Sequence, residues 1–309
     1  MVEKLNDRVF IIDDHDLGVE ERTGTYVILE EQLTLVDTCA SPSVPYIKEG
    51  LKELGLSLEQ VKYIIVTHIH LDHAGGAGLL LEDCPNAKVV VHPKGARHLA
   101  DPSRLVAGAK MVYGDKFEQL FNPVVPVPED RLLIKTEGDQ LQIGQNCILE
   151  FWDTPGHAKH HFSIIDPIGS GIFAGDTVGI RYEQLAKDGH HFYLPSTSPN
   201  QFDPIAMQAA IERIRNEKFD VIYYGHYGMT SDSADALAQV EEWLNIFVEE
   251  AETAKVNGVG PEQLAEELME RVKNHLKTLE IPDSHEVYEI IRLDLEVSSM
   301  GLMEYVSKK

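Results

Sequence analysis

Short apolar runs alternate with helix-like segments over the first three quarters of the chain. Runs of β-branched and aromatic residues bounded by turn residues predict strands. We place these strands at residues 9–12, 26–30, 33–37, 62–67, 87–92, 132–135, 141–143, 148–153, 161–166, 171–176 and 219–226. The two strands that flank Glu31 and Gln32 are typical of a hairpin, and the unbroken apolar run at 62–67 indicates a strand buried on both faces.

Helical stripes separate several of these strands. Pro45 opens a segment that carries Ile47, Leu51 and Leu54 on one stripe, which predicts a helix that begins near this proline. A helical stretch is predicted around 98–120 and a further helix over 204–217. Asp203, directly before Pro204, is expected to cap the last of them.

The pattern changes after about Ser233, where helical spacing continues with two interruptions. Gly258 and Gly260 mark the first interruption and Pro282 the second, so we expect three helices. Strands that alternate with helices, followed by a helical tail, predict an α/β (α+β) sandwich with a C-terminal helical appendage. We divide the chain into a catalytic domain at 1–232 and a helical region at 233–309. The tail is expected to act either as a lid or as the face of a homodimer.

The charge balance narrows the possible partners. A formal net charge of −24 repels polyanions, so we expect a small-molecule substrate and neither nucleic acid nor an anionic membrane. No apolar run approaches the roughly 20 residues of a membrane span, and the first residues lack the apolar stretch of a secretory signal. Three scattered cysteines form no CxxC pair. Together these features predict a cytoplasmic protein without a disulfide framework.

The strongest chemical signal is the sequence THIHLDH, which follows the buried strand at 62–67. It places His68, His70, Asp72 and His73 in one loop, where a strand end aims several side chains at one point. Imidazole and carboxylate donors suit Zn, Fe or Mn, and the lack of thiolates favours a catalytic site over a structural zinc site. One short motif alone would still be compatible with a chance cluster of surface histidines.

Three further motifs repeat the same arrangement of strand, small turn and ligand-type residue. TPGH places His157 after the strand at 148–153, GDT places Asp176 after the apolar stretch from Gly171, and YYGH places His226 after the strand from Phe219. A glycine directly precedes each of the three, which lets backbone pass close to a crowded site. Donor residues at the ends of several strands indicate one shared metal site.

In this order and spacing, HxHxDH, TPGH, GDT and GH resemble the metallo-β-lactamase superfamily over roughly residues 8–230. The resemblance implies an αββα sandwich with the site at one edge, between two sheets. It also implies that Asp37, in LVDTC, supports the ligand loop, although Cys39 stands where the family often has glycine. The resemblance further implies a first metal on His68, His70 and His157, a second on Asp72, His73 and His226, and Asp176 as the bridge between them.

Two departures point to a branch of this superfamily. His70 stands where flavodiiron-type members have Glu, and no cysteine takes a ligand position as in many true β-lactamases. The pattern is closest to the glyoxalase II, lactonase and general hydrolase branch, and LPSTSPNQFDP is similar to a prokaryotic subgroup of it. We therefore expect a dinuclear hydrolase that uses a metal-bridging hydroxide on a small ester, lactone, thioester or phosphodiester.

Two other functions remain open at this point. A mononuclear iron persulfide dioxygenase would share HxHxDH but bind one iron, and a metal-binding scaffold would lack catalysis. For the hydrolase we expect two divalent ions, zinc first, with iron or manganese as alternatives. Asp72 or Asp176 could accept the proton released by the nucleophile. Tyr193 and Tyr227 are either oxyanion donors or packed aromatic residues.

Overall fold

The structure is a computed structural model that describes residues 1–309. The chain forms two compact units. The first comprises residues 1–153, 160–175 and 219–231, and the second comprises residues 154–159, 176–218 and 232–309. The division of the chain at residue 232 into two folding domains stays a prediction. None of the helices is both long and apolar enough to cross a membrane.

The first unit contains a seven-stranded sheet in simple sequential order. It runs through β1 (Val2–Lys4), β2 (Val9–Asp13), β3 (Gly24–Ile28), β4 (Leu33–Val36), β5 (Val61–Ile65), β6 (Lys88–Val91) and β7 (Leu132–Ile134). β1 to β4 pair antiparallel, which confirms the predicted hairpin of β3 and β4. β4 to β7 pair parallel, so each of these connections needs a crossover.

The crossovers supply the helices of the first unit. These are α1 (Val44–Glu53), α2 (Leu71–Ala74), α3 (Ala77–Asp83), α4 (Pro93–Ala100), α5 (Ser103–Tyr113) and α6 (Phe117–Phe121). Pro45 lies in the first turn of α1, where its missing N–H costs nothing. The helical stretch predicted around 98–120 is divided among α4, α5 and α6, because Asp101 is extended and Gly114 has φ +55°.

A second, six-stranded sheet completes the first unit. Its order is β15 (Met229–Thr230), β14 (Val221–Tyr224), β11 (Gly171–Gly175), β10 (Phe162–Asp166), β9 (Ile148–Asp153) and β8 (Gln140–Gln142). β11 and β14 pair parallel and the other neighbours antiparallel. The two C-terminal ends of β11 and β14 therefore lie side by side at one edge of this sheet.

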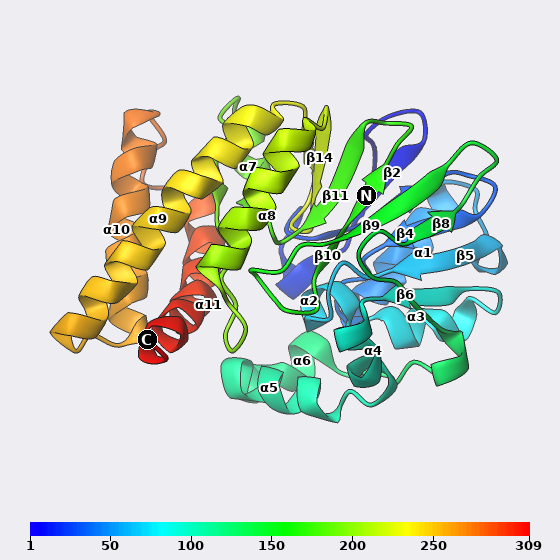
Figure 1. Cartoon of the computed structure of the whole chain (residues 1–309), viewed down its shortest axis with the longest axis horizontal. Coiled ribbons are helices and arrows are strands. Elements are labelled where there is room, and N and C mark those ends of the chain that lie inside the picture. The colour runs from blue at the N-terminus through cyan, green and yellow to red at the C-terminus, as the bar shows by residue number, and fades with distance from the viewer. The chain divides into compact units, whose positions relative to one another are not determined.

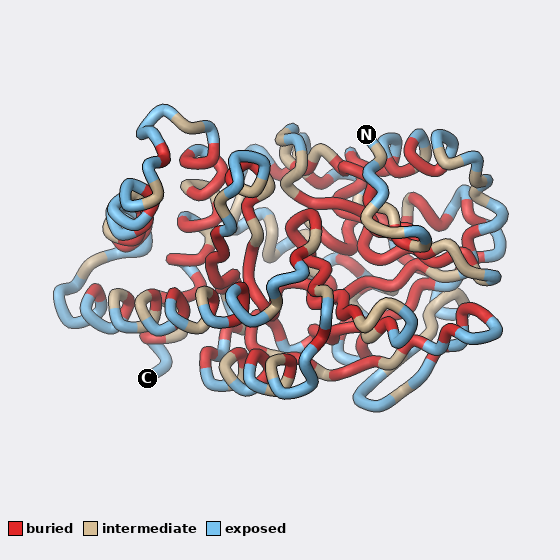
Figure 2. The backbone as a smooth tube through the Cα atoms, turned by 90° about the horizontal axis from the view of Figure 1, so that it is seen from above, coloured by how far each residue is buried: buried red, intermediate tan, exposed pale blue.

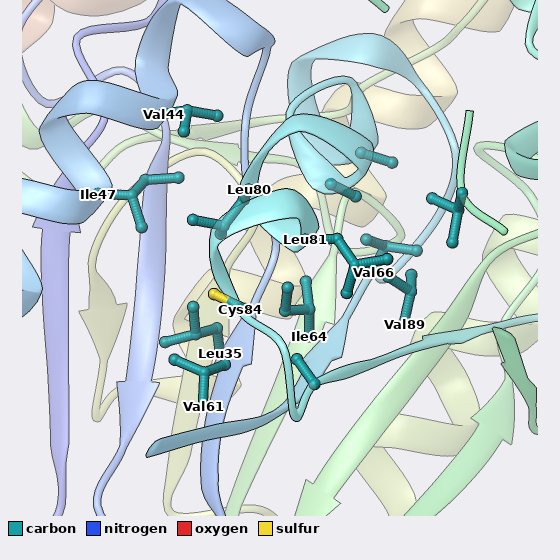
Figure 3. Close-up of a cluster of buried hydrophobic side chains, with 14 of the residues drawn as sticks. Leu35, Val44, Ile47, Val61, Ile64, Val66, Leu80, Leu81, Cys84 and Val89 are labelled. Carbon is teal, nitrogen blue, oxygen red and sulfur yellow. The ribbon is translucent and has the colours of Figure 1, made fainter. Parts of the chain in front are cut away.

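Alternation along the strands builds two apolar layers. Ile64 packs with Ile47 of α1 and Leu80 of α3, in the layer between the first sheet and its helices (Figure 3). Ile65, the next residue, packs with Phe151 of the second sheet, in the layer between the two sheets. One strand thus faces two cores, as the unbroken apolar run of β5 predicts. This sandwich of mixed sheets with helices confirms the predicted α+β class.

The second unit is mostly helical (Figure 1). It contains the two-stranded ribbon of β12 (Ile180–Arg181) and β13 (Tyr193–Leu194), with α7 (Glu183–Lys187), α8 (Pro204–Glu217), α9 (Ser233–Asn257), α10 (Pro261–Thr278) and α11 (Val287–Ser307). The three predicted tail helices are present, and Gly258 caps α9 with φ +69°. Each tail helix turns one face inward, so buried and exposed positions alternate along it (Figure 2).

Candidate metal centre

The loop after β5 carries the first group of predicted ligands, and a buried carboxylate holds this loop in place. Asp37 Oδ1 accepts a hydrogen bond from the Thr67 backbone N–H at 2.7 Å. The Thr67 hydroxyl donates to the same carboxylate, and Asp37 Oδ2 lies 3.0 Å from His73 Nδ1. Asp37 has φ +61°, a left-handed conformation that aspartate tolerates better than most residues. The expected support of the loop by Asp37 is confirmed.

The five predicted ligands of the first unit lie together. The imidazole centroid of His68 is 4.6 Å from that of His70 and 4.2 Å from that of His73. The centroid of His226, which follows β14, is 5.3 Å from that of His73. His68 and His73 are fully buried, so the protein fixes where their ring nitrogens point.

Asp72, His73 and His226 form a group whose donor atoms all lie within 4.8 Å of one another. Asp72 Oδ2 is 3.6 Å from His73 Nε2 and 3.9 Å from His226 Nε2. Because Asp37 engages Nδ1 of His73, the other nitrogen of that ring is the one turned toward Asp72. Two imidazoles and one carboxylate fit a Zn, Fe or Mn ion. The Asp72 side chain is 25% exposed, which leaves this group open to a small molecule.

The second unit holds the remaining two predicted ligands, His157 and Asp176. His157 Nε2 lies 3.6 Å from Asp176 Oδ2, and both side chains are buried. His157 Nδ1 is 3.0 Å from the Ser196 carbonyl oxygen, so the ring donates from Nδ1 and turns Nε2 toward Asp176. The Ser196 hydroxyl donates to Asp176 Oδ2 at 3.1 Å, and the Ser198 hydroxyl donates to the His157 carbonyl at 2.8 Å.

Sequence reasoning missed these two serines, because a Ser-Thr-Ser stretch is typical of loops and helix caps. Only the folded structure shows that these serines contact the predicted ligands His157 and Asp176. Asp203, by contrast, caps α8 as predicted, since its carboxylate accepts hydrogen bonds from two backbone N–H groups of the first turn.

Two of the glycines before the ligands are required by the local geometry. Gly156 has φ +141°, and a Cβ there would come within 2.4 Å of the Met207 backbone. Gly175 has φ +53°, and a Cβ there would lie 2.4 Å from His161 Nε2. A side chain at either position would displace the residue that follows, so the predicted role of these glycines is confirmed.

Further buried groups surround the ligands of the first unit. The His160 ring is 5.3 Å from that of His70, and the His161 ring is 5.2 Å from that of His68. Asp16, in the loop between β2 and β3, pairs with Arg22 at 3.2 Å. Burial raises the pKa of Asp16, while the charge of Arg22 opposes that shift. Burial also raises the pKa of the Cys39 thiol well above its ordinary value, so this residue offers no thiolate.

The two tyrosines proposed as oxyanion donors are both buried. Tyr227 has φ +55° and belongs to the apolar layer between the two sheets, and its hydroxyl lies 3.5 Å from a carboxylate oxygen of Glu3. These contacts favour the packed aromatic for Tyr227. Tyr193 lies on β13 of the second unit, and its role as a donor stays a prediction.

Comparison with known proteins assigns this arrangement to a family. Residues 20–226 match the family model described as the metallo-beta-lactamase superfamily. The chain is 25% identical over 215 residues to the metallo-beta-lactamase fold-containing protein ST1585 of Sulfurisphaera tokodaii, covering 68% of this chain and 75% of that protein. It is 26% identical over 118 residues to the hydroxyacylglutathione hydrolase of Legionella pneumophila, covering 38% of this chain and 34% of that one.

Solved structures agree on the fold. The crystal structure of ST1585 aligns with a TM-score of 0.67 at 22% identity, covering 96% of this chain and 98% of that one. The family protein TTHA1429 of Thermus thermophilus aligns with a TM-score of 0.69 at 18% identity, covering 99% of this chain and 95% of that one. With the matched region spanning the predicted ligand motifs from His68 to His226, the chain belongs to the metallo-beta-lactamase superfamily, whose members are mostly metal-dependent hydrolases.

Proposed function

We propose that this protein is a dinuclear metal-dependent hydrolase acting on a small ester, lactone, thioester or phosphodiester. The observation that carries the proposal is the group of Asp72, His73 and His226, with its donor atoms within 4.8 Å of one another and His73 oriented by Asp37. In this proposal the two ions are held by His68, His70, Asp72, His73, His157, Asp176 and His226.

The chemistry of the donors supports such a site. Neutral imidazoles and carboxylates bind Zn, Fe and Mn, with zinc as our first choice. Asp176 directly follows Gly175, the last residue of β11, and His226 follows β14, which is paired with β11. Bound metal ions would supply a water nucleophile at neutral pH and polarise the substrate oxygen under attack.

The chain's own residues would position the reactants and accept a proton. The Asp72 side chain is 25% exposed, so this carboxylate is our candidate acceptor for the proton of the attacking water. The Ser196 hydroxyl donates to Asp176 and so stabilises the ionised form of that carboxylate. We therefore assign proton transfer to Asp72 before Asp176.

Two observations support a small-molecule substrate: one sequence relative and the net charge of the chain. A hydroxyacylglutathione hydrolase shares part of the sequence, and the net charge of −24 disfavours polyanionic partners such as nucleic acid or an anionic membrane. We therefore propose a small molecule as the substrate.

The test is elemental analysis of protein purified without added metal, followed by a screen of lactones, thioesters and phosphodiesters. We expect two equivalents of metal per chain and metal-dependent hydrolysis. Asp176→Ala should lose metal and turnover together, while Ile205→Ala, at an exposed position of α8, should keep both. A single equivalent of iron and oxygen uptake with persulfides would overturn the proposal in favour of sulfur oxygenation.

A further inference from the structure

We propose that α11 positions two of the metal ligands, His157 and Asp176, by supporting the backbone of residues 196–198. This inference rests on the proposed function, because it assigns a role toward the metal ions to a helix more than a hundred residues away in the sequence. It also makes α11 part of the active-site architecture, which the predicted alternatives of a lid or a dimer face do not require.

The first step is the dependence of both ligands on residues 196–198. Ser196 contacts His157 through its carbonyl oxygen at 3.0 Å and Asp176 through its hydroxyl at 3.1 Å. Ser198 adds a hydrogen bond from its hydroxyl to the His157 carbonyl at 2.8 Å. Any displacement of this segment therefore moves the hydrogen-bond partners of both ligands. Such partners fix the ring orientation and basicity of a metal-bound histidine.

The second step is the direct contact of this segment with the backbone of α11. The Thr197 hydroxyl donates to the Ser298 carbonyl oxygen at 2.8 Å. Gly301, one turn further along, has no side chain on the face that meets the segment. A Cβ at Gly301 would lie 2.5 Å from the Thr197 carbonyl oxygen and 2.7 Å from the Ser198 carbonyl carbon. These are backbone atoms, so the clash cannot be relieved by rotating a side chain.

The third step is that α11 is itself held in register on both sides of Gly301. Toward its start, the Tyr182 hydroxyl donates to the buried carboxylate of Asp294 at 3.1 Å. Toward its end, the Lys255 ammonium of α9 donates to the Val306 carbonyl oxygen at 2.5 Å. Because the helix is fixed on both sides, a side chain at Gly301 should push residues 196–198 away rather than shift the helix.

The test compares Gly301→Ala with Gly260→Ala and Met300→Ala in the full chain. A Cβ at Gly260 meets nothing within 4 Å, and Met300 is a partly exposed neighbour of Gly301 on α11. The measurements are metal stoichiometry, metal affinity by chelator competition, and the melting temperature of the metal-free protein. We expect Gly301→Ala to weaken the affinity for metal about 10- to 100-fold, the range for lost ligand-orienting contacts. The two controls should keep the affinity of the unmodified protein.

A second pair of variants covers the case in which Gly301→Ala does not fold. Thr197→Val removes the hydroxyl that reaches α11, whereas Thr197→Ser keeps it. The proposal expects weaker metal binding in the first and recovery in the second. It is overturned if Thr197→Val, or a folded Gly301→Ala protein, binds both ions with unchanged affinity. An unmodified chain that takes up no divalent metal would overturn the proposed function itself, which separates the two failures.

Discussion

The two units orient their candidate metal-binding histidines with different kinds of partner. In the first unit, His73 Nδ1 lies 3.0 Å from the carboxylate of Asp37. In the second unit, His157 Nδ1 lies 3.0 Å from the backbone carbonyl of Ser196. A carboxylate makes an imidazole more basic as well as orienting it, whereas a carbonyl orients it without adding charge. At these two histidines, the first unit thus uses a charged partner and the second a backbone partner.

This difference extends to the supporting residues. In the first unit, one carboxylate contacts three groups: Asp37 accepts from the Thr67 backbone N–H and the Thr67 hydroxyl, and it lies beside His73 Nδ1. In the second unit the corresponding work is divided among Ser196, Ser198 and the helix behind them. Loss of one supporting side-chain group should therefore weaken metal binding more in the first unit than in the second, and this expectation orders the predictions below.

The largest effect is expected for Asp37→Asn, which keeps the size of the side chain and tolerates φ +61°. It removes the charge beside His73 and turns an amide N–H₂ toward groups that donate. We expect metal affinity at Asp72, His73 and His226 to fall about 10- to 100-fold. The free energy of unfolding should fall by about 1–3 kcal/mol. Metal titration and urea unfolding measure the two quantities. An unchanged metal affinity would contradict the claim that the charge of Asp37 supports metal binding through His73.

A smaller effect is expected for Ser196→Ala. This change removes the hydroxyl that donates to Asp176 but keeps the carbonyl that accepts from His157. The loss of one hydrogen bond to a charged group corresponds to roughly a tenfold loss of metal affinity. Chelator competition on this variant and on Asp37→Asn, side by side, tests the order. A larger loss for Ser196→Ala would reverse the comparison.

The mildest effect concerns pH and a second buried carboxyl of the first unit. Burial raises the pKa of Asp14 well above its ordinary value of 3.8, and a hydrogen bond from the Thr25 hydroxyl only partly opposes this shift. The folded protein therefore favours protonated Asp14. The contribution of Asp14 to the free energy of unfolding is fully present below pH 3.8, and it is lost as the pH rises toward the raised pKa.

Asp14→Asn should flatten this loss. The measurement is urea unfolding of both metal-free proteins at a series of pH values above about 4. It gives the difference in the free energy of unfolding between Asp14→Asn and the unmodified chain. Parallel pH profiles for the two proteins would show that Asp14 is ionised in the fold. In that case a buried carboxylate of the first unit could stay ionised without the several hydrogen-bond donors that surround Asp37.

Much of the fold could be predicted because its signals are local. The strand at 148–153 and the helix at 204–217 have the predicted bounds, since a period of two or an apolar stripe is visible within a single window. The ribbon of β12 and β13 was not predicted, because two residues per strand give no periodicity. The helix boundaries within 98–120 were not predicted, because α5 buries no residue and so shows no clear apolar stripe.

The candidate site divides in the same way. His68 to His73 stand in one motif, and the glycines before His157 and Asp176 mark their turns in the sequence. The supporting contacts of Ser196 and Ser198 could not be predicted, because they depend on residues that meet only after folding. Thr197 and Ser298 are 101 positions apart, and no local pattern links them.

Gly301, where the backbone of α11 meets residues 196–198, also bears on the order of folding events during synthesis. Residues 196–198 leave the ribosome well before Gly301, so until then they lack the helix backbone against which they rest. Domains generally form as their chain emerges. The loop and strands that carry His68 to His73 can therefore assemble early, whereas His157 and Asp176 gain their final support only after α11 has been made. If the proposed function holds, a nascent chain would complete its metal-binding groups only after the last helix has been made.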